Sequence, residues 1–175
     1  MALSEQAICI RTTDYSETSQ VLRFLTRGAG IVSILAKGSK RPKSKSGGAL
    51  DLLSEGQIVF TQPASGAMGT LFEFTETVSH LPLRTEARRL NTGLYMTEFI
   101  GLLLGEGDAH PDAFDLLHNA LGRLADADAP VEAVLAYFQW RMLRHAGLLG
   151  QLSNCVECDV SINAEHGAGA VFFSS

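Results

Sequence analysis

The hydrophobic periodicity of the chain changes once, near Pro82, and this change constrains the fold more than any other feature. Before Pro82, apolar and polar residues mostly alternate, which is the pattern of half-buried strands. After it, apolar residues recur three and four positions apart, which is the pattern of amphipathic helices. A chain of 175 residues with one such change is predicted to be an α+β protein, with a β domain followed by helices.

Five short segments before Pro82 are predicted to be strands. They cover residues 7–12, 20–26, 30–37, 57–61 and 70–77, and the second is apolar on both faces. Gly28 to Gly30 has the composition of a hairpin turn, and residues 62–69 form a Pro/Gly/Ser-rich loop. Five short strands favour a small barrel over a sandwich, and the OB-fold is the commonest barrel of this size. We therefore predict a five-stranded OB-fold β-barrel at the N-terminus.

Three helices are predicted after Pro82. The first covers residues 85–104, the second begins at Pro111, and the third begins near Pro130 and ends near Gly147. The links are short, so the helices are expected to share one core. We divide the chain into an OB-fold nucleic-acid-binding domain (1–80), a helical domain (81–150) and a partial zinc-binding segment (151–175). No apolar run is long enough to span a bilayer and no signal peptide is apparent, which favours a cytoplasmic location.

Charge is distributed very unevenly. The net charge is −5, but residues 1–45 carry +5 and the remainder −10, and all four lysines lie between positions 37 and 45. Such an asymmetry indicates a localised anion-binding face on an acidic body. The basic loop, residues 36–48, holds the five cations Lys37, Lys40, Arg41, Lys43 and Lys45 and no acid.

The basic loop is predicted to bind the phosphate backbone of nucleic acid. Its Gly, Pro and Ser residues exclude regular structure and leave backbone N–H groups free for phosphate oxygens. Contacts of this kind do not read base edges, so binding would be salt-sensitive and nearly sequence-blind. Arg11, on the strand face opposite Ile8 and Ile10, is added as a DNA-binding candidate. The competing interpretation is a solvated linker.

Two other readings of the loop are less favoured. It does not match the phosphate-binding motif G-x-x-x-x-G-K-[ST] in any register, and no helix follows it, so nucleotide hydrolysis is not predicted. Base stacking would need exposed aromatic side chains beside the loop. The candidates are better explained as core residues, so backbone binding is favoured; they are Tyr15, Phe24, Phe60, Phe72 and Phe74.

Cys155 and Cys158 have the spacing of a zinc-binding pair and supply half of a four-ligand site. Cys9 lies in a strand pattern and is expected to be a buried small hydrophobe. Asp115 and His118 share a helix face and could hold a metal, although a solvated polar face is the more economical interpretation. Among the residues of this chain, no set resembles a catalytic motif, so we do not expect an enzyme.

Several stretches together resemble the bacterial RecO family of DNA repair and recombination proteins. They are Thr13-Asp14-Tyr15-Ser16-Glu17, Leu25-Thr26-Arg27, the run from Ala36 to Ser44, and Phe138 to Leu143 followed by Cys155-Val156-Glu157-Cys158. The run AKGSKRPKS is the most specific of these. The resemblance spans nearly the whole chain, and the second cysteine pair of the family is absent. We therefore expect either a truncated chain, which we favour, or a divergent short family member.

The resemblance implies an OB-fold, a helical domain and a zinc ribbon in a protein that is not an enzyme. It implies binding of single- and double-stranded DNA, annealing of complementary strands, and action with RecR and the single-stranded DNA-binding protein SSB to help load RecA. It assigns DNA binding to the five loop cations and zinc to Cys155 and Cys158, at a nucleoid-associated location. For the acidic tail of SSB, charge alone suggests the helical-domain arginines Arg84, Arg88, Arg89, Arg141 and Arg144.

Two alternative functions remain open from the sequence. The first is an adaptor whose basic loop binds an acidic protein partner and not DNA. The second is a metal-dependent enzyme that uses the cluster between His110 and His118.

Overall fold

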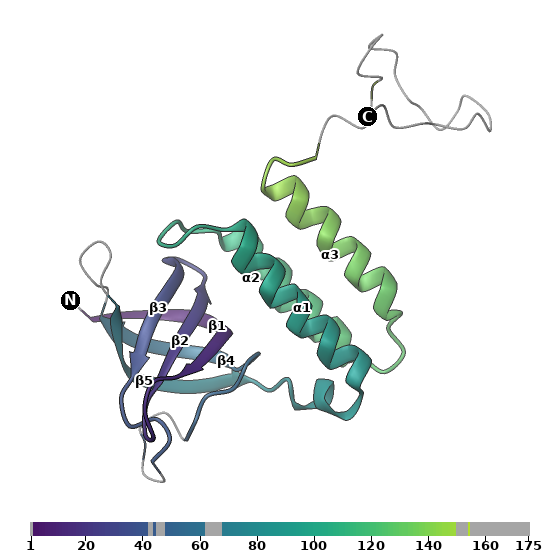
Figure 1. The fold of residues 1–175 in the computed structure, drawn as a ribbon. Helices are drawn as coiled ribbons and strands as arrows, with labels where there is room; N and C mark the ends of the chain where they lie inside the picture. The colour runs from purple at the N-terminus through teal and green to yellow at the C-terminus, as the bar shows by residue number, and fades with distance from the viewer. Residues whose placement is uncertain (1, 42–43, 45–47, 62–67, 150–153, 155–175) are drawn as a thin grey trace.

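A computed structural model describes residues 2–41, 44, 48–61, 68–149 and 154. The chain forms a five-stranded barrel followed by three helices that lie beside it (Figure 1). The strands are β1 (Ala2–Asp14), β2 (Gln20–Thr26), β3 (Gly30–Ala36), β4 (Glu55–Thr61) and β5 (Gly69–Val78). All five predicted strands are confirmed. β1 is longer than predicted because its first half pairs with β4 and its second half with β2.

The strand order around the closed barrel is β1-β2-β3-β5-β4. All neighbours are antiparallel except β3 and β5, whose short parallel pairing closes the barrel. This topology is that of the OB-fold. The barrel interior is packed with apolar side chains, of which Phe24, Phe60 and Ile58 are completely buried. Cys9 belongs to this interior, so its prediction as a small buried hydrophobe is confirmed.

A 3₁₀ turn, Leu81–Thr85, leads from the barrel into the helices α1 (Ala87–Leu103), α2 (Pro111–Ala125) and α3 (Val131–His145). Pro111 occupies the first turn of α2, where the lost N–H costs nothing. Gly147 adopts a left-handed φ of 69° just past α3, and Leu148 N–H donates to the Leu143 carbonyl, which ends the helix as predicted. Among the described residues, no helix has both the length and the apolar content to cross a membrane.

The helices do not have a core separate from the barrel. Ile8, Ile10, Leu25 and Ile31 lie on the outer surface of β1, β2 and β3 and belong to the same buried cluster as the apolar faces of all three helices. This explains why the second predicted strand is apolar on both faces: Leu22 and Phe24 fill the barrel, whereas Leu25 packs on the helices. Position 80 therefore marks a change of secondary structure but not a break in the packing.

The turn between β2 and β3 fits closely against the loop that joins α1 to α2. Gly30 has φ +70°, and a Cβ there would lie 2.0 Å from the carbonyl oxygen of Asp108. Gly107 N–H donates to the Ile31 carbonyl at 3.1 Å, so the loop continues the hydrogen bonding of the barrel edge. This approach requires glycine at position 30, because any side chain would push the two backbones apart.

Candidate nucleic-acid interface

The first part of the basic loop is held against the turn between β1 and β2. Gly38 N–H donates to the Ser19 hydroxyl at 3.1 Å, and Lys40 N–H donates to the Thr18 carbonyl at 3.1 Å. Arg41 N–H donates to the Gly38 carbonyl at 3.1 Å, which closes a tight turn. Gly38 has φ +66°, a left-handed conformation that favours glycine. The start of the loop is therefore a built feature of the barrel edge and not a free linker.

The side chain of Gln20 ties both ends of the loop together. Its amide nitrogen donates to the Leu50 carbonyl and its amide oxygen accepts from Leu50 N–H, both at 3.0 Å. The same oxygen accepts the buried Ser39 hydroxyl at 3.0 Å. Ser39 lies near the start of the basic loop, and Leu50 lies just after its end. One buried glutamine therefore fixes where the loop leaves the barrel and where it rejoins it. We call this arrangement the Gln20 clamp.

The structure describes three of the five predicted loop cations. Lys37 and Arg41 are exposed, and neither forms an ion pair with any described residue. Lys40 Nζ lies 2.6 Å from Asp14 Oδ1, so part of its charge is already balanced within the fold. Lys43 and Lys45 lie outside the described residues.

Two aromatic side chains expected in the core are exposed instead. Phe24, Phe60 and Phe74 are buried as predicted, but Tyr15 is 66% exposed and Phe72 48%. Tyr15 follows directly after β1, in the turn that holds the basic loop, where alternation along the strand no longer determines which way a side chain points. The interpretation as core residues is therefore wrong for Tyr15 and Phe72.

Arg11 is exposed on the outer face of β1. The alternation placed it on the face opposite Ile8 and Ile10, which is wrong, because an irregularity in the strand register between Cys9 and Arg11 brings Arg11 to the same outer face as these two residues. Arg11 pairs in register with Arg23 of β2, so two arginines stand side by side on one face of the barrel. Arg23 lies in the strand that was interpreted as apolar on both faces, and sequence reasoning missed it.

The helical arginines differ in how many contacts each already makes within the fold. Arg89 is buried and donates to four main-chain carbonyls at the end of α2 and the loop after it, those of Leu124, Asp126, Ala127 and Ala129. Its guanidinium also pairs with Glu86 at 2.7 Å. Arg89 thus satisfies the free carbonyls of a helix end, and among the partner-binding candidates it is the one already engaged within the fold.

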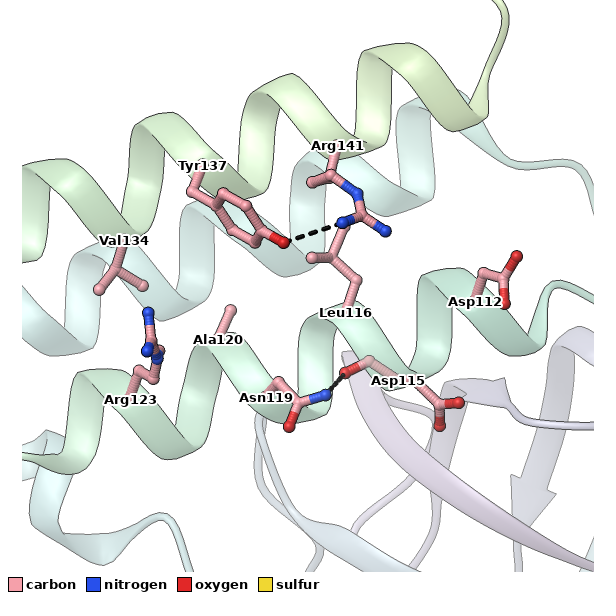
Figure 2. Close-up of a pocket in the computed structure, with 9 residues that line it drawn as sticks. All are labelled: Asp112, Asp115, Leu116, Asn119, Ala120, Arg123, Val134, Tyr137 and Arg141. Atoms are coloured by element: carbon pink, nitrogen blue, oxygen red, sulfur yellow. Dashed lines mark hydrogen bonds between the residues drawn. The ribbon is translucent and has the colours of Figure 1, made fainter.

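The other four arginines remain at the surface. Arg84 pairs with Asp51 at 3.2 Å and Arg88 pairs with Glu132. Arg141 lies on α3 beside a groove of about 660 Å³ between α2 and α3 (Figure 2). There it donates to the Tyr137 hydroxyl at 2.8 Å. Arg144 is exposed one turn further along α3 and is not ion-paired with any described residue.

The residues between His110 and His118 do not form a metal site. Asp115 accepts two hydrogen bonds from Arg27, at 3.0 and 2.9 Å, and the Arg27 guanidinium holds the pKa of the Asp115 carboxyl below its ordinary value. His118 contacts Glu55 of β4 at 2.6 Å, and His110 contacts His145 at 3.2 Å. In the part of the chain that the structure describes, no three His, Cys, Asp or Glu side chains are arranged to hold a metal ion. Asp115 and His118 thus join α2 to the barrel, and His110 contacts the end of α3.

Glu55 is the centre of a second polar contact between barrel and helices. Its carboxylate is buried, with His80 Nε2 at 2.8 Å from one oxygen and His118 Nδ1 at 2.6 Å from the other. With protons on those two nitrogens, both imidazoles donate to the carboxylate. The three residues come from β4, from the connection before α1, and from α2. We call them the Glu55 clasp.

The cysteines fall into two groups. Burial raises the pKa of the Cys9 thiol from 9.0 to about 12, so it stays protonated and inert at neutral pH. Cys155 and Cys158 lie outside the described residues.

The described part of the chain is thus an OB-fold barrel with an anchored cationic loop, backed by a helical unit that shares its outer core. Comparison with known proteins identifies the family. Residues 1–78 match the family model described as recombination protein O N terminal, and residues 84–170 match that of recombination protein O C terminal. The chain belongs to the RecO family of DNA repair proteins.

Relatives in two bacteria illustrate the match. The chain is 34% identical over 143 residues to the DNA repair protein RecO of Salinibacter ruber, covering 82% of this chain and 55% of that protein. It is 33% identical over 152 residues to that of Rhodopirellula baltica, covering 87% of this chain and 56% of the relative. The chain therefore spans little more than half the length of these relatives.

Proposed function

We propose that this protein is a DNA-binding recombination mediator that binds single- and double-stranded DNA through the basic loop and anneals complementary strands. One observation carries the proposal: the loop is anchored to the barrel edge, and its cations Lys37 and Arg41 are exposed without an ion-pair partner among the described residues. An unpaired cation on a fixed backbone gains a phosphate partner without first losing a protein one. Membership of a family whose relatives are named DNA repair proteins supports the same reading.

The geometry favours backbone contacts supplemented by stacking. Lysine and arginine on a loop neutralise phosphates without regard to sequence. The exposed ring of Tyr15, in the turn that holds the loop, offers a surface on which a base can stack. Annealing requires two polyanions to approach each other, and a cationic edge lowers the repulsion between them. No bond is made or broken in this scheme, so we propose a binding protein and not an enzyme.

The partners follow from charge and family. We propose that the acidic tail of SSB lies along the groove between α2 and α3, where Arg141 supplies positive charge, and reaches Arg144 in the adjoining pocket. The groove also contains Leu116 and Val134, which suit an apolar chain end. RecR binding, RecA loading, and a cytoplasmic, nucleoid-associated location are part of the same proposal. The thiolates of Cys155 and Cys158 are suitable zinc donors and supply two of four ligands.

The test is binding of a fluorescent single-stranded oligonucleotide across a salt series. The double substitution Lys37→Gln/Arg41→Gln is expected to reduce the slope of log K against log salt by roughly 1.4, because each lost single-strand phosphate contact removes about 0.7. Asp14→Asn, which frees Lys40 from its ion pair, is expected to strengthen binding.

The matched control is Ala133→Glu/Ala136→Glu, which changes the net charge equally on the exposed side of α3. It should leave the slope unchanged. If loop and control variants bind with the same slope as the native protein, the loop is not the DNA contact. If the native protein binds no DNA but the loop captures an acidic protein, the adaptor alternative replaces this function.

A further inference from the structure

A cleft separates the outer face of β1 and β2 from helix α1, about 400 Å³ in volume. Arg11, Thr12 and Arg23 line it from the barrel, and Thr97, Glu98 and Leu102 line it from α1. Neither the basic loop nor the groove between α2 and α3 contributes a residue to it. The cleft is therefore separate from both surfaces described above.

The two arginines in the cleft are a like-charged pair. They are register partners on adjacent antiparallel strands, where side chains on one face lie about 5 Å apart at Cβ. Like charges in that position repel unless an anion lies between or beside them. Glu106 partly meets this need, since its Oε1 lies 3.3 Å from Arg23 Nη2, but it also accepts the Ser33 hydroxyl at 3.0 Å. Arg11 forms no ion pair with a described residue.

Arg23 has a donor that the fold does not satisfy. Its Nε is buried and has no hydrogen-bond partner among the described residues. The side chain as a whole is 27% exposed, so the guanidinium still reaches the cleft. Buried donors are nearly always paired, and an unpaired one calls for a missing partner. A guanidinium presents its donors in a planar fork that suits the oxygens of a phosphate.

The cleft lies along the hairpin of β1 and β2, and the turn of the same hairpin holds the start of the basic loop. Arg11 precedes Asp14, the ion-pair partner of Lys40, by three residues of β1, which corresponds to about 10 Å along an extended strand. Leu102, at the rim, is 78% exposed and offers apolar surface to a sugar or base. A strand held by the loop can therefore continue along β1 and β2 into the cleft.

We propose that Arg11 and Arg23 hold a backbone phosphate of single-stranded DNA in this cleft, as a second contact beyond the basic loop. The inference rests on the proposed DNA binding. It commits to a single strand because the phosphate must pass between the barrel and α1 to reach Arg23, and a strand paired with its complement carries too much bulk on one side. Glu98, exposed on the α1 wall, opposes the phosphate and limits the affinity.

The experiment measures binding of single-stranded oligonucleotides of about 4 and about 16 nucleotides, the range of site sizes for one OB-fold, and of the duplex form of the longer one. With the longer oligonucleotide, Arg11→Gln should weaken binding by about threefold to tenfold and lower the salt slope by roughly 0.7. With the shorter one, which the loop alone can hold, the effect should be small. Arg23→Lys, which keeps the charge but loses the fork, should also weaken binding of the longer strand. Glu98→Gln should strengthen it.

Ala133→Glu is the control, since it makes the same change in net charge on α3. Thermal unfolding of each variant shows whether the Arg23 substitution disturbs the fold, and Arg11→Gln carries the test if it does. If the loop variants lose binding while Arg11→Gln behaves like Ala133→Glu, this inference is wrong and the proposed function stands. Equal loss of duplex and single-strand binding by Arg11→Gln would overturn the single-strand assignment. Absence of DNA binding by the native protein would overturn both.

Discussion

At the level of single residues, burial decides which polar groups are left for a ligand. Arg89 and Arg11 carry the same side chain, yet Arg89 is 9% exposed and donates to four carbonyls, whereas Arg11 is exposed and forms no ion pair with a described residue. Removing Arg89 would leave those carbonyls without hydrogen-bond donors, and this costs free energy because buried acceptors need partners. Removing Arg11 would leave the fold intact. Only the second arginine can be tested cleanly for function.

Cys9 provides a prediction at this scale. Its pKa is raised from 9.0 to about 12 by burial, so above pH 9 the unfolded chain loses the thiol proton while the folded protein keeps it. The contribution of the buried, protonated thiol to the free energy of unfolding is therefore fully present below pH 9 and is lost as the pH rises towards 12. Between pH 9 and pH 12, the free energy of unfolding is expected to fall by about 1.4 kcal/mol per pH unit.

Urea unfolding of the native protein and of Cys9→Ala at successive pH values measures this effect. The difference between the two free energies of unfolding should be constant below pH 8 and change steadily above pH 9. Other groups that titrate in this range cancel in the difference. A difference that stays constant up to pH 11 would mean that the thiol is not shielded from solvent.

At the level of elements, the basic loop depends on the hairpin beside it. The first residues of the loop hydrogen bond to Thr18 and Ser19, and the Gln20 clamp joins its two ends. The hairpin thereby limits the conformations of a segment whose composition alone favours disorder. The loop therefore loses less conformational entropy when it binds a ligand.

The Gln20 clamp is tested by Gln20→Leu. The substitution keeps a similar volume but removes the partner of three buried groups, so the free energy of unfolding should fall by about 1–3 kcal/mol. Cleavage of the loop by a protease should also become faster. Gln57→Leu is the control, because Gln57 makes one exposed hydrogen bond, to Ser4, and its loss should change stability by less than about 0.5 kcal/mol. Equal stability of the two variants would show that the clamp contributes nothing.

At the level of the whole molecule, polar contacts fix how the helices sit on the barrel. The apolar cluster that spans β1, β2, β3 and the helices stabilises their packing through the hydrophobic effect, which is not directional. The Glu55 clasp and the Arg27–Asp115 pair add direction, because each joins the barrel to α2 through defined atoms. Glu55 and His80 are buried, whereas Arg27 and Asp115 are about half exposed.

This difference predicts unequal consequences of substitution. Glu55→Leu removes the acceptor of two imidazoles and should lower the free energy of unfolding by about 3 kcal/mol. His118→Ala should cost less, about 1 kcal/mol, because its side chain is 43% exposed and water replaces the lost contact. Arg27→Ala should have a smaller effect than Glu55→Leu, and one that disappears at high salt. Thermal and urea unfolding at two salt concentrations provide the measurement, and a salt-sensitive Glu55→Leu effect would contradict the buried clasp.

Local pattern was sufficient for the elements and for the basic loop. The five strands, the three helices, the start of α2 at Pro111 and the end of α3 before Gly147 follow from the periodicity, prolines and glycines near each boundary. The pattern failed at Tyr15 and Phe72, which looked like core aromatics but are exposed, and charge alone did not show that Arg89 is buried. These failures concern the surroundings of a side chain and not its secondary structure.

The sequence by itself therefore determined the succession of strands and helices, the location of the cationic loop and the family resemblance, because these depend on neighbours along the chain. The tertiary structure alone decided that Arg11 stands beside Arg23, that Gln20 closes the loop, and that Glu55 meets His80 and His118. These contacts join residues that are distant in sequence. Their formation depends on how the barrel closes and how the helices pack on it, which no local pattern encodes.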